Sequence, residues 1–338
     1  NDPVGGRSGE AFYIRDEQTG VFWSPTPGPS RGTTTYVCRH GLGYSAFEHR
    51  QNDIFSETMI YVPVDAPVKV TLIKIRNLSG RERKLSVTSF AECAVGELQG
   101  RSSMHVVSRI DPQTNAVFLT NSFNTEFSNV IVFAQVSESE RTFTGDRTEF
   151  IGRNGSLEKP AAMFKRELSN RVGPALDPCA AIQTCVSIPP NQERHVVFIL
   201  GGANSKEEAR SIIQKYSYRA GAWQALEKVW DSWKHCLGAI NVETPDTALN
   251  LLVNNWLLYQ AIACRIWGRS GFYQSGGAFG FRDQLQDCMA LLHCRPDMLR
   301  SHILLCASRQ FNEGDVQHWW HPPSGRGIRT RFSDDCLW

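Results

Sequence analysis

The residues best suited to chemistry gather in the closing stretch of the chain, from Glu313 to Trp338. This stretch holds two histidines, three tryptophans, three arginines and the adjacent carboxylates Asp334 and Asp335. Aromatic rings can stack on sugars, guanidinium groups bind hydroxyls and phosphates, and a carboxylic acid can donate a proton. Because the stretch is also rich in Gly and Pro, we expect a loop that forms a site for a sugar or a phosphate ester.

The two adjacent acids are expected to play different roles. Their side chains cannot both point the same way unless the local backbone is irregular, so one should face a pocket while the other orients the segment. If the pocket acid packs against Phe332 or Trp338, the loss of water raises its pKa and keeps it protonated as a general acid. A solvated Asp-Asp turn is the alternative, and the surrounding aromatic residues favour a functional role.

The basic residues of the closing stretch leave two interpretations open. Its arginines could bind an anion or fold back on aspartates; the arginines are Arg326, Arg329 and Arg331, and the aspartates are Asp315, Asp334 and Asp335. His318 and His321 have a spacing that could serve a metal on a helix, but the two prolines that follow end any helix there. Since the pattern also supplies no third ligand, we expect no metal.

A second candidate segment runs from Gly268 to Asp283 and reads GRSGFYQSGGAFGFRD. Such a loop between apolar helices exposes backbone amides, and it ends in Arg282 and Asp283 at the start of a helix. Asp283 suits the first turn of that helix, so these two residues could simply cap the helix and pair with each other. The aromatic residues of the loop argue for a site instead. The loop lacks the Lys-Ser/Thr pair of a nucleotide phosphate loop.

The elements that must position these residues change type along the chain. From Glu10 to about Leu200 the sequence consists of short segments rich in Val, Ile, Thr and aromatic residues, separated by Gly, Pro, Asn and Asp. That spacing is typical of an antiparallel β-sandwich. From Val68 to Ile75 neither alternate set of side chains is polar throughout, so we expect this strand to be covered on both faces.

At Ser205 the hydrophobic period becomes helical. Ser205 to Glu208 matches a capping box, and a helix should follow it. A second helical run carries four large apolar residues on one face, namely Trp223, Leu226, Trp230 and Trp233. Core packing against the sandwich is the more common explanation of such a stripe than ligand stacking. We expect these two helices to link two domains.

Helices continue from Thr244, which we expect to be an N-cap followed by Pro245 in the first turn. The run from Leu249 to Trp267 is apolar nearly all round, so this helix should be buried on most sides. Two further helical stretches span residues 282–293 and 296–310. The chain therefore has a multidomain β + α pattern, with a sandwich followed by an all-helical domain.

The overall composition argues against several classes of function. A length of 338 residues favours two domains, and 36 Lys+Arg against 34 Asp+Glu leave a formal charge of only +2, which argues against nucleic acid as a partner. No apolar segment approaches the roughly 18 residues that span a bilayer. The ten cysteines lie mostly in apolar segments without a C-x-x-C zinc pattern, so we expect a reducing compartment.

Several long motifs resemble the phosphorylase module of glycoside hydrolase family 94. They read NDPVGGRSGEAFYIRD, TGVFWSPTP, YVCRHGLGYSAFEH, FYQSGGAFGFRDQLQD and GDVQHWWHPPSGRGIRTRFSDDCLW, and they span the chain. Within that family the chain is most similar to the phosphorylase-like domains of cyclic β-1,2-glucan synthases. The resemblance implies an N-terminal antiparallel β-sandwich over residues 1–203, a helical linker over residues 204–240 and the first part of an (α/α)6 barrel over residues 241–338.

The resemblance also implies inverting phosphorolysis of β-linked, here β-1,2-linked, glucooligosaccharides. One Asp protonates the glycosidic oxygen while inorganic phosphate, the co-substrate, attacks the anomeric carbon from the other face; no cofactor is implied. By motif alignment this general acid falls on Asp334, with Asp335 as the second choice. The substrate-binding residues implied by the motifs are Arg269, Arg282, Asp283, Trp319, Trp320, Arg329 and Asp335.

Two departures from the family pattern bear on function. Some members carry a phosphate-binding arginine where this chain has Gly276, Gly277 and Ala278, so its phosphate contacts should come from elsewhere. Relatives also extend beyond both ends of this sequence. We therefore expect a fragment that is inactive alone or needs a second segment to complete the barrel, since bare barrel helices would leave large apolar faces exposed.

The setting expected from this resemblance is a cytoplasmic module of an inner-membrane synthase, where it would control the chain length of cyclic β-1,2-glucan. A homodimer is an open possibility. The residues are also compatible with two alternative functions. The first is an inverting β-glucan hydrolase, which needs a second carboxylate about 6.5–9.5 Å from the acid to hold a water. The second is a non-catalytic module that binds glucan through Trp319, Trp320 and the sandwich.

Overall fold

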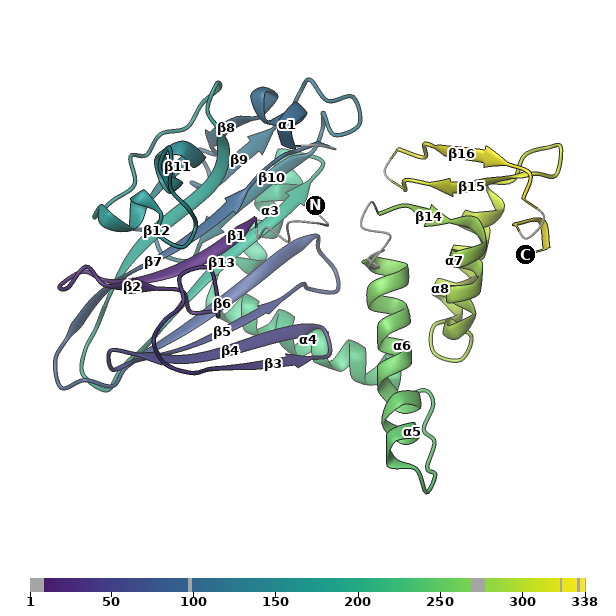
Figure 1. The fold of residues 1–338 in the computed structure, drawn as a ribbon, viewed down its shortest axis with the longest axis horizontal. Coiled ribbons are helices and arrows are strands. Elements are labelled where there is room, and N and C mark those ends of the chain that lie inside the picture. The colour runs from purple at the N-terminus through teal and green to yellow at the C-terminus, as the bar shows by residue number, and fades with distance from the viewer. Residues whose placement is uncertain (1–8, 97–98, 269–276, 323, 333–334, 338) are drawn as a thin grey trace. The chain divides into compact units, whose positions relative to one another are not determined.

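The computed structural model of the chain describes residues 9–96, 99–268, 277–322, 324–332 and 335–337 (Figure 1). The chain forms two compact units, Ser8–Trp230 and Asp231–Trp338, and the boundary falls inside helix α4 (Arg219–Leu237). The first unit is built mainly from strands and the second from helices with a small sheet. The predicted order of a sandwich followed by helices is confirmed.

Two antiparallel sheets form the sandwich of the first unit. The five-stranded sheet has the order β11-β12-β7-β1-β2, and the eight-stranded sheet has the order β3-β4-β5-β6-β13-β10-β9-β8. The strands of the five-stranded sheet are β1 (Glu10–Asp16), β2 (Phe22–Trp23), β7 (Arg83–Glu92), β11 (Arg141–Asp146) and β12 (Pro178–Ile188). Those of the eight-stranded sheet are β3 (Tyr36–Gly41), β4 (Tyr44–Gln51), β5 (Ile54–Tyr61), β6 (Val68–Asn77), β8 (Val107–Ile110), β9 (Val117–Thr120), β10 (Ile131–Val136) and β13 (Glu193–Ala203).

Strand β1 divides its side chains between two cores. Phe12 and Ile14 pack in the core between the two sheets, whereas Ala11 and Tyr13 pack in a second core on the other face of the five-stranded sheet. That second core is closed by α2 (Arg147–Ile151) and the 3₁₀ turn Ala161–Phe164. Because both faces are covered, the strand is apolar throughout and does not alternate. A short helix α1 (Gln99–Ser102) and a 3₁₀ turn (Ser103–His105) precede β8.

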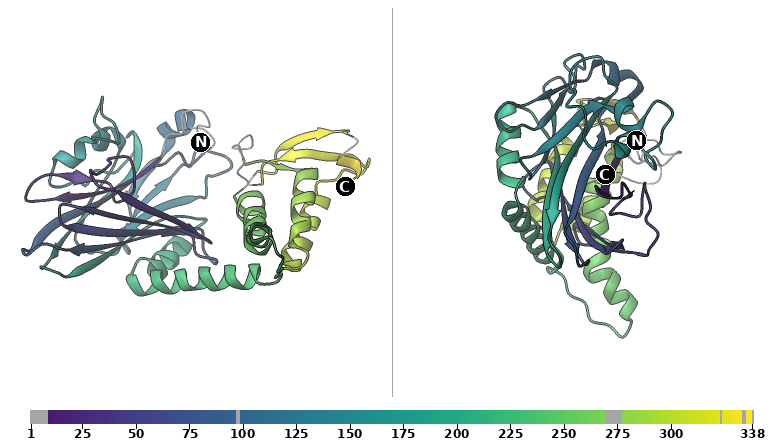
Figure 2. Two further views of the ribbon diagram at one scale, coloured as in Figure 1. Left: turned by 60° about the horizontal axis from the view of Figure 1, so that its bottom comes forward. Right: turned by 90° about the vertical axis from the view of Figure 1, so that its left-hand side faces the viewer.

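Strand β6 is also covered on both faces, as its sequence predicts. Val70 and Ile73 point to opposite faces, and both are fully buried. One face belongs to the core between the sheets, which includes Ile73, and helices cover the outer face of the eight-stranded sheet. Figure 2 shows these helices, α3 (Lys206–Tyr216) and the start of α4, on that side of the sheet.

Helix α3 begins where the sequence predicts. The Ser205 hydroxyl accepts a hydrogen bond from the Glu208 backbone N–H at 3.1 Å, which caps the helix. Its buried face carries Ala209, Ile212, Ile213 and Tyr216. On the partly buried side, the Arg210 guanidinium donates through Nε and Nη2 to the Asp111 carboxylate, at 3.1 and 2.7 Å to Oδ1. This fork joins α3 to the hairpin of β8 and β9.

The tryptophan stripe of α4 does not pack as one face. Leu226 is fully buried against the sheet, but the Trp223 side chain is 44% exposed. Trp233 is buried in the second unit, where its ring lies 4.6 Å from that of Tyr259. The prediction of uniform core packing is therefore wrong for Trp223, because the buried side of this part of the helix carries Ala222, Leu226 and Val229 instead.

The second unit opens with one continuous helical run. It consists of α5 (Thr247–Leu251), a π-helical turn (Leu252–Trp256), α6 (Leu257–Gln260) and a longer π-helical stretch (Ala261–Trp267). The expected N-cap is wrong: Asp246, not Thr244, accepts hydrogen bonds from the first backbone N–H groups, at 2.9 and 3.2 Å. The Thr244 hydroxyl instead accepts from the Asp246 backbone N–H, so it supports the cap from outside.

This helical run is less buried than its apolar sequence predicts. Within it only Ile262 and Ile266 are buried, and both lie in the part against which α7 packs. Leu251 and Leu257 are 67% and 57% exposed. Further large apolar side chains exposed in this unit are Leu249, Leu252, Trp256, Trp267, Met289, Leu292, Ile303 and Leu304. Exposed apolar side chains in this number offer a place where other protein surface can pack.

The rest of the second unit is formed by two helices and a small sheet. The helices are α7 (Phe281–Cys288), which a 3₁₀ turn (Met289–Leu291) follows, and α8 (Pro296–Ala307). The sheet has the order β14-β15-β16, with β14 (Phe279–Gly280), β15 (Val316–Trp320) and β16 (Gly327–Thr330), and a 3₁₀ turn (Asp335–Leu337) comes last. In the described residues no helix has both the length and the apolar character that crossing a membrane requires.

Arg210→Gln is expected to weaken the attachment of α3 to the sheet. Hydrogen bonds from Arg210 hold the pKa of the Asp111 carboxyl at about 2, below its usual 3.8. Because this pKa is depressed in the folded state, the carboxylate contributes stability above its unfolded pKa, and this contribution is lost as the pH falls through the folded pKa. The variant should therefore melt at a lower temperature near neutral pH, and its difference from the parent should shrink as the pH falls from 3.8 toward about 2.

Circular dichroism melting curves over that pH range measure this difference. Arg153→Gln is a matched control, because Arg153 is exposed and lies outside this ion pair. A deficit of Arg210→Gln that stays constant down to the lowest pH would contradict the assigned role of the pair.

Candidate active site

The two segments that the sequence singles out meet in the small sheet of the second unit. Strand β14 directly precedes α7, and it pairs with β15 so that Phe279 lies opposite Trp320 and Gly280 opposite Trp319. The first turn of α7, which carries Arg282 and Asp283, therefore adjoins the aromatic strand of the closing stretch. This pairing brings together residues that are about forty positions apart in the sequence.

The closing stretch forms a hairpin, so the expectation of a loop is wrong. Strands β15 and β16 pair antiparallel, with Trp319 opposite Ile328 and Trp320 opposite Gly327. A side chain at Gly327 would overlap the backbone carbonyl of Trp319, so this position requires glycine. The turn between the strands contains Gly325 at a φ of 68°, which favours glycine as well. The glycines that suggested a loop therefore serve the turn and the close approach of two strands.

Trp320 anchors this sheet from inside. Its side chain is fully buried in a cluster with Phe279, Phe281, Val316 and Cys306. Its ring lies 5.9 Å from that of Phe279 in an edge-on arrangement, and the Arg309 guanidinium carbon lies 5.4 Å from its centre. A ring with no exposed surface has no face for a sugar in this structure, so here Trp320 is a packing residue. Its neighbour Trp319 is only partly buried.

His318 occupies an irregular position in β15. The register between β15 and β16 shifts between Gln317 and Trp319, which makes His318 the extra residue of a β-bulge. Bulges re-aim side chains, and the His318 Nδ1 lies 2.7 Å from the Oδ2 of Asp335. The Thr330 hydroxyl lies 3.4 Å from the same oxygen. The Asp335 side chain is 2% exposed, so its carboxylate ties the residues after β16 to the bulge.

Asp335 contacts the hairpin, and the roles that the sequence gives it, second-choice general acid and substrate-binding residue, stay predictions. Its carboxylate is buried and faces His318 and Thr330. Asp334, the expected general acid, lies outside the described residues, and so do Arg269 and residues 269–276 of the Gly-rich loop. Their roles stay predictions.

Arg329 folds back on acidic neighbours, which is one of the two alternatives left open by the sequence. Its Nε and Nη2 donate to the two Asp315 oxygens at 2.7 and 2.6 Å, and Nη2 also donates to Glu313 at 2.9 Å. The guanidinium carbon lies 4.0 Å from the centre of the Phe311 ring. Hydrogen bonding from Arg329 lowers the pKa of Asp315. Arg331 is 86% exposed and lies 3.9 Å from the same carboxylate, so its head group is open to solvent.

Asp283 lies in the first turn of α7, as expected. Its carboxylate packs directly over Gly280, where a Cβ atom would overlap it. The absence of a side chain at Gly280 therefore sets the position of this carboxylate. Arg282, the residue before Asp283, is exposed. The structure thus places an acidic and a basic side chain at the start of α7, beside β15.

A buried polar chain that the sequence did not reveal holds α7 in place. The Gln284 amide donates to the backbone carbonyl of Arg265 at 3.1 Å, and its oxygen lies 2.7 Å from the Nε2 of His302 in α8. Gln284 and His302 are both buried, and burial lowers the pKa of His302 although Asp287 opposes this shift. The neutral imidazole is thereby favoured. In the sequence, the one hint of this polar chain is Gln284, a polar residue directly after the Arg-Asp pair.

Among the described residues, no group of three or more His, Cys, Asp and Glu side chains is arranged to hold a metal ion. His318 is in the bulge with Asp335, and the His321 ring packs against that of Trp319 at 5.5 Å. The nine cysteines that the structure describes all carry free thiols.

Comparison with known proteins identifies the family. Residues 1–219 match the supersandwich domain of glycosyl hydrolase 94, and residues 232–338 match the catalytic domain of the glycosyl hydrolase 94 superfamily. The chain belongs to glycoside hydrolase family 94. It is 40% identical, over its whole length, to the cyclic beta-(1,2)-glucan synthase NdvB of Rhizobium meliloti (strain 1021), of which it covers 12%.

Proteins named as phosphorylases are also among the relatives of this chain. The chain is 27% identical to the N,N'-diacetylchitobiose phosphorylase of Vibrio proteolyticus, with 98% of this chain and 46% of that protein aligned. It spans less than half the length of both of these relatives. A solved structure of a bacterial glucoamylase complexed with acarbose has the same fold over 95% of this chain and 47% of its own, with a TM-score of 0.57 at 9% identity.

His318→Ala is expected to destabilise the second unit. Among the described residues, removing the imidazole leaves the buried Asp335 carboxylate with the Thr330 hydroxyl at 3.4 Å as its remaining side-chain partner, at a cost of about 1–3 kcal/mol in the free energy of unfolding. His321→Ala is the matched control, because the hydrogen bond of that residue to Arg326 is made by its backbone. Urea unfolding followed by tryptophan fluorescence measures both variants. Equal losses for the two would show that His318 does not anchor Asp335.

Proposed function

We propose that this chain forms part of an inverting glycoside phosphorylase that acts on β-linked glucooligosaccharides with inorganic phosphate. The observation that carries the proposal is the match of both units to the two domains of glycoside hydrolase family 94. The pairing of β14 with β15 supports it, because that pairing joins the Arg-Asp segment to the aromatic and acidic stretch. Relatives named as phosphorylases align over nearly the whole chain.

In the proposed mechanism Asp334 is the general acid. It protonates the glycosidic oxygen while phosphate attacks the anomeric carbon from the opposite face, so the anomeric configuration inverts. Inverting hydrolysis needs a second carboxylate to activate water, whereas phosphate is itself an anionic nucleophile and needs a cationic cradle instead. The position of Asp335 supports this assignment indirectly, because a carboxylate that is buried on His318 is poorly placed to donate a proton to a substrate.

The proposed sugar-binding residues surround the small sheet. Arg282 and Asp283 at the start of α7 would hold hydroxyls of the sugar at the cleaved end. Arg269, a further candidate by motif alignment, lies outside the described residues. Trp319 is the aromatic candidate, since Trp320 is buried. Arg329 already forms ion pairs with Asp315 and Glu313. We therefore propose that it orients the hairpin, or that it leaves one of these partners to bind substrate. The exposed Arg331 is a further cation available to phosphate.

The finer features of the function are also proposals. The β-1,2 linkage and a role in setting glucan chain length rest on the name of the synthase relative. The exposed apolar side chains of the helical unit support the proposal that a second barrel segment packs on it and that turnover needs this segment. We further propose a cytoplasmic location as a module of an inner-membrane synthase. A homodimer remains a prediction.

Asp334→Asn is expected to abolish turnover and to spare sugar binding. Loss of a general acid typically lowers the rate by about 10²–10⁴-fold. The assay incubates the protein in its full natural length with β-1,2-linked glucooligosaccharide, with and without phosphate, and measures glucose 1-phosphate and free glucose. Asp335→Asn should also lower activity, but together with thermal stability, because it weakens the contact with His318.

The same assay separates the candidate functions. Phosphate-dependent glucose 1-phosphate that disappears in Asp334→Asn supports the proposal. Free glucose formed without phosphate would identify a hydrolase, and binding without turnover would identify a glucan-binding module. Full activity of Asp334→Asn would move the general acid to another residue.

Gly280→Ala tests the role of Asp283. The added methyl group must displace the Asp283 carboxylate, and a misplacement of about 1 Å can lower kcat/KM roughly 10²-fold. Gly80→Ala is a matched control, since nothing lies near the position of its added Cβ. Steady-state phosphorolysis kinetics of both variants, combined with melting curves, check this expectation. A folded Gly280→Ala variant with parental kinetics would exclude Asp283 as a substrate-binding residue.

A further inference from the structure

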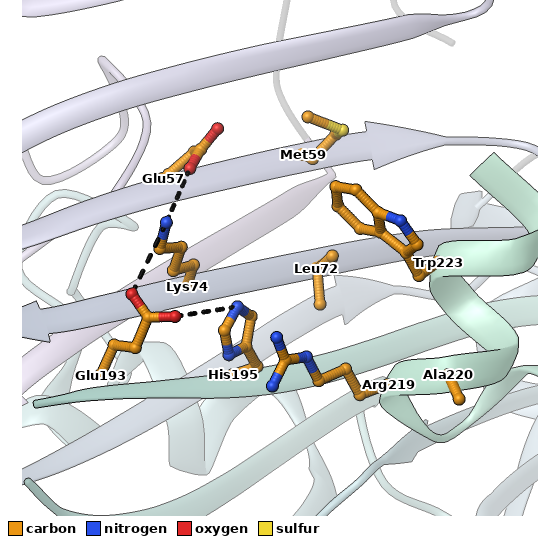
Figure 3. Close-up of a pocket in the computed structure, with 9 residues that line it drawn as sticks. All are labelled: Glu57, Met59, Leu72, Lys74, Glu193, His195, Arg219, Ala220 and Trp223. Carbon is orange, nitrogen blue, oxygen red and sulfur yellow. Dashed lines mark ion pairs between the residues drawn. The ribbon is translucent and has the colours of Figure 1, made fainter. Parts of the chain in front are cut away.

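The outer face of the eight-stranded sheet carries a groove that contains none of the residues of the proposed active site. It lies over β5, β6 and β13 and is bordered by the first turns of α4, and its volume is about 520 Å³ (Figure 3). This size falls within the range of roughly 300–1,000 Å³ that is usual for small-molecule sites. All the lining residues belong to the unit Ser8–Trp230, so the groove is complete within one compact unit.

One end of the groove is apolar. Figure 3 shows Trp223 from α4 beside Met59 of β5 and Leu72 of β6. The Trp223 side chain is 44% exposed, which is unusual for the largest apolar side chain on a helix that packs on a sheet. An exposed indole beside other apolar side chains offers a flat surface on which a ligand can stack.

Two further aromatic side chains, Trp230 and Tyr44, support the indole of Trp223. Its ring meets that of Trp230 edge-on, at 6.2 Å and 86°, and Trp230 in turn meets Tyr44 of β4 at 5.8 Å and 71°. Edge-on aromatic pairs of this kind restrict the orientation of both rings. The stacking surface is therefore formed before any ligand binds, which lowers the entropic cost of binding.

The other end of the groove is charged and internally balanced. The Lys74 ammonium lies between two carboxylates, 3.7 Å from Glu57 and 3.6 Å from Glu193, and His195 lies 3.9 Å from Glu193 (Figure 3). These separations are longer than those of direct hydrogen bonds, so the groups have donor and acceptor capacity to spare. Burial, and then the nearby Arg219, lower the pKa of His195, which favours its neutral form.

The two ends together select a class of ligand. An anion would meet Glu57 and Glu193, and a cation would meet Lys74 and Arg219, so neither kind of charge is favoured. A purely apolar ligand would bury the charged end without hydrogen bonds, which is costly. A sugar has an apolar face of C–H groups and a rim of hydroxyls that both donate and accept, and thus matches both ends.

We propose that this groove is a second, non-catalytic binding site for a neutral oligosaccharide, with Trp223 as the stacking platform and Lys74, Glu193 and His195 as hydroxyl partners. The sugar class, a β-linked glucooligosaccharide, rests on the proposed function. The site would hold part of a long glucan on the sandwich while another part occupies the catalytic unit. Retention of this kind raises the local concentration of chain ends at the catalytic unit.

Fluorine NMR of the full chain labelled with 5-fluorotryptophan tests the site directly. The chain has nine tryptophans, and Trp223→Phe assigns the resonance of interest by its disappearance. Titration with β-1,2-linked glucotetraose should shift the Trp223 resonance in a saturable way. The resonance of Trp256, which is 50% exposed and lies in the other unit, is the internal control and should stay in place. Lys74→Met should weaken the binding reported by Trp223 by about tenfold or more.

Several outcomes would overturn the proposal. They are a Trp223 resonance that does not move, a shift equal to that of Trp256, or a shift caused by inorganic phosphate and not by the sugar. Because the titration needs no turnover, its result is independent of the phosphorolysis assay. A saturable shift with β-1,3- or β-1,4-linked glucotetraose but not with the β-1,2-linked sugar would support the groove and contradict the β-1,2 linkage proposed for the catalytic site. A β-1,2-specific shift in this chain, together with no turnover by the protein in its full natural length, would leave the groove assigned and the proposed catalytic function refuted.

Discussion

The pairing of β14 with β15 is the constraint on which the candidate active site depends. It sets Gly280 opposite Trp319 and Phe279 opposite Trp320, and in this register Trp320 and Phe279 both fill the core of the small sheet. A shift by one residue would expose the Trp320 indole and turn Trp319 into the core. The position of the α7 start relative to the closing stretch follows from this single register.

Around this sheet, polar groups fix what the apolar core leaves undetermined. The buried Asp335 carboxylate meets His318 at the bulge, and Gln284 joins α7 to His302 and to the backbone of Arg265. Each of these groups would be costly to bury without its partner, so the contacts specify one arrangement of strands and helices. The residues proposed to touch substrate are more exposed than these supporting groups, as Arg282 and Trp319 illustrate.

The sequence predicts the elements of this chain better than it predicts their roles. The strands, the switch at Ser205 and the helix from Thr247 to Trp267 were predictable because each has its own hydrophobic period. The hairpin was not, since Gly325 and Gly327 are typical of a loop until the close approach to Trp319 is known. The difference between Trp319 and Trp320 was hidden as well, because two adjacent tryptophans give no indication of which one faces the core.

Long-range contacts account for the other surprises. The bulge that turns His318 toward Asp335 arises from pairing with β16 and leaves no local signal in the sequence. Trp223 belongs to an apolar stripe, yet its position in α4 lies beyond the edge of the face that meets the sheet, and a groove results. Burial of the helix that begins near Leu249 depends on the elements packed against it, and within its unit α7 packs mainly against its last part, Ala261–Trp267.

We propose that this family 94 chain forms part of an enzyme that carries out phosphorolysis with inversion. The most direct measurement is proton NMR of the sugar 1-phosphate formed during the first turnovers of a β-linked glucooligosaccharide in phosphate buffer. Inversion by one protonated acid and an attacking phosphate predicts the α-anomer of glucose 1-phosphate. The β-anomer, or free glucose as the first product, would contradict it.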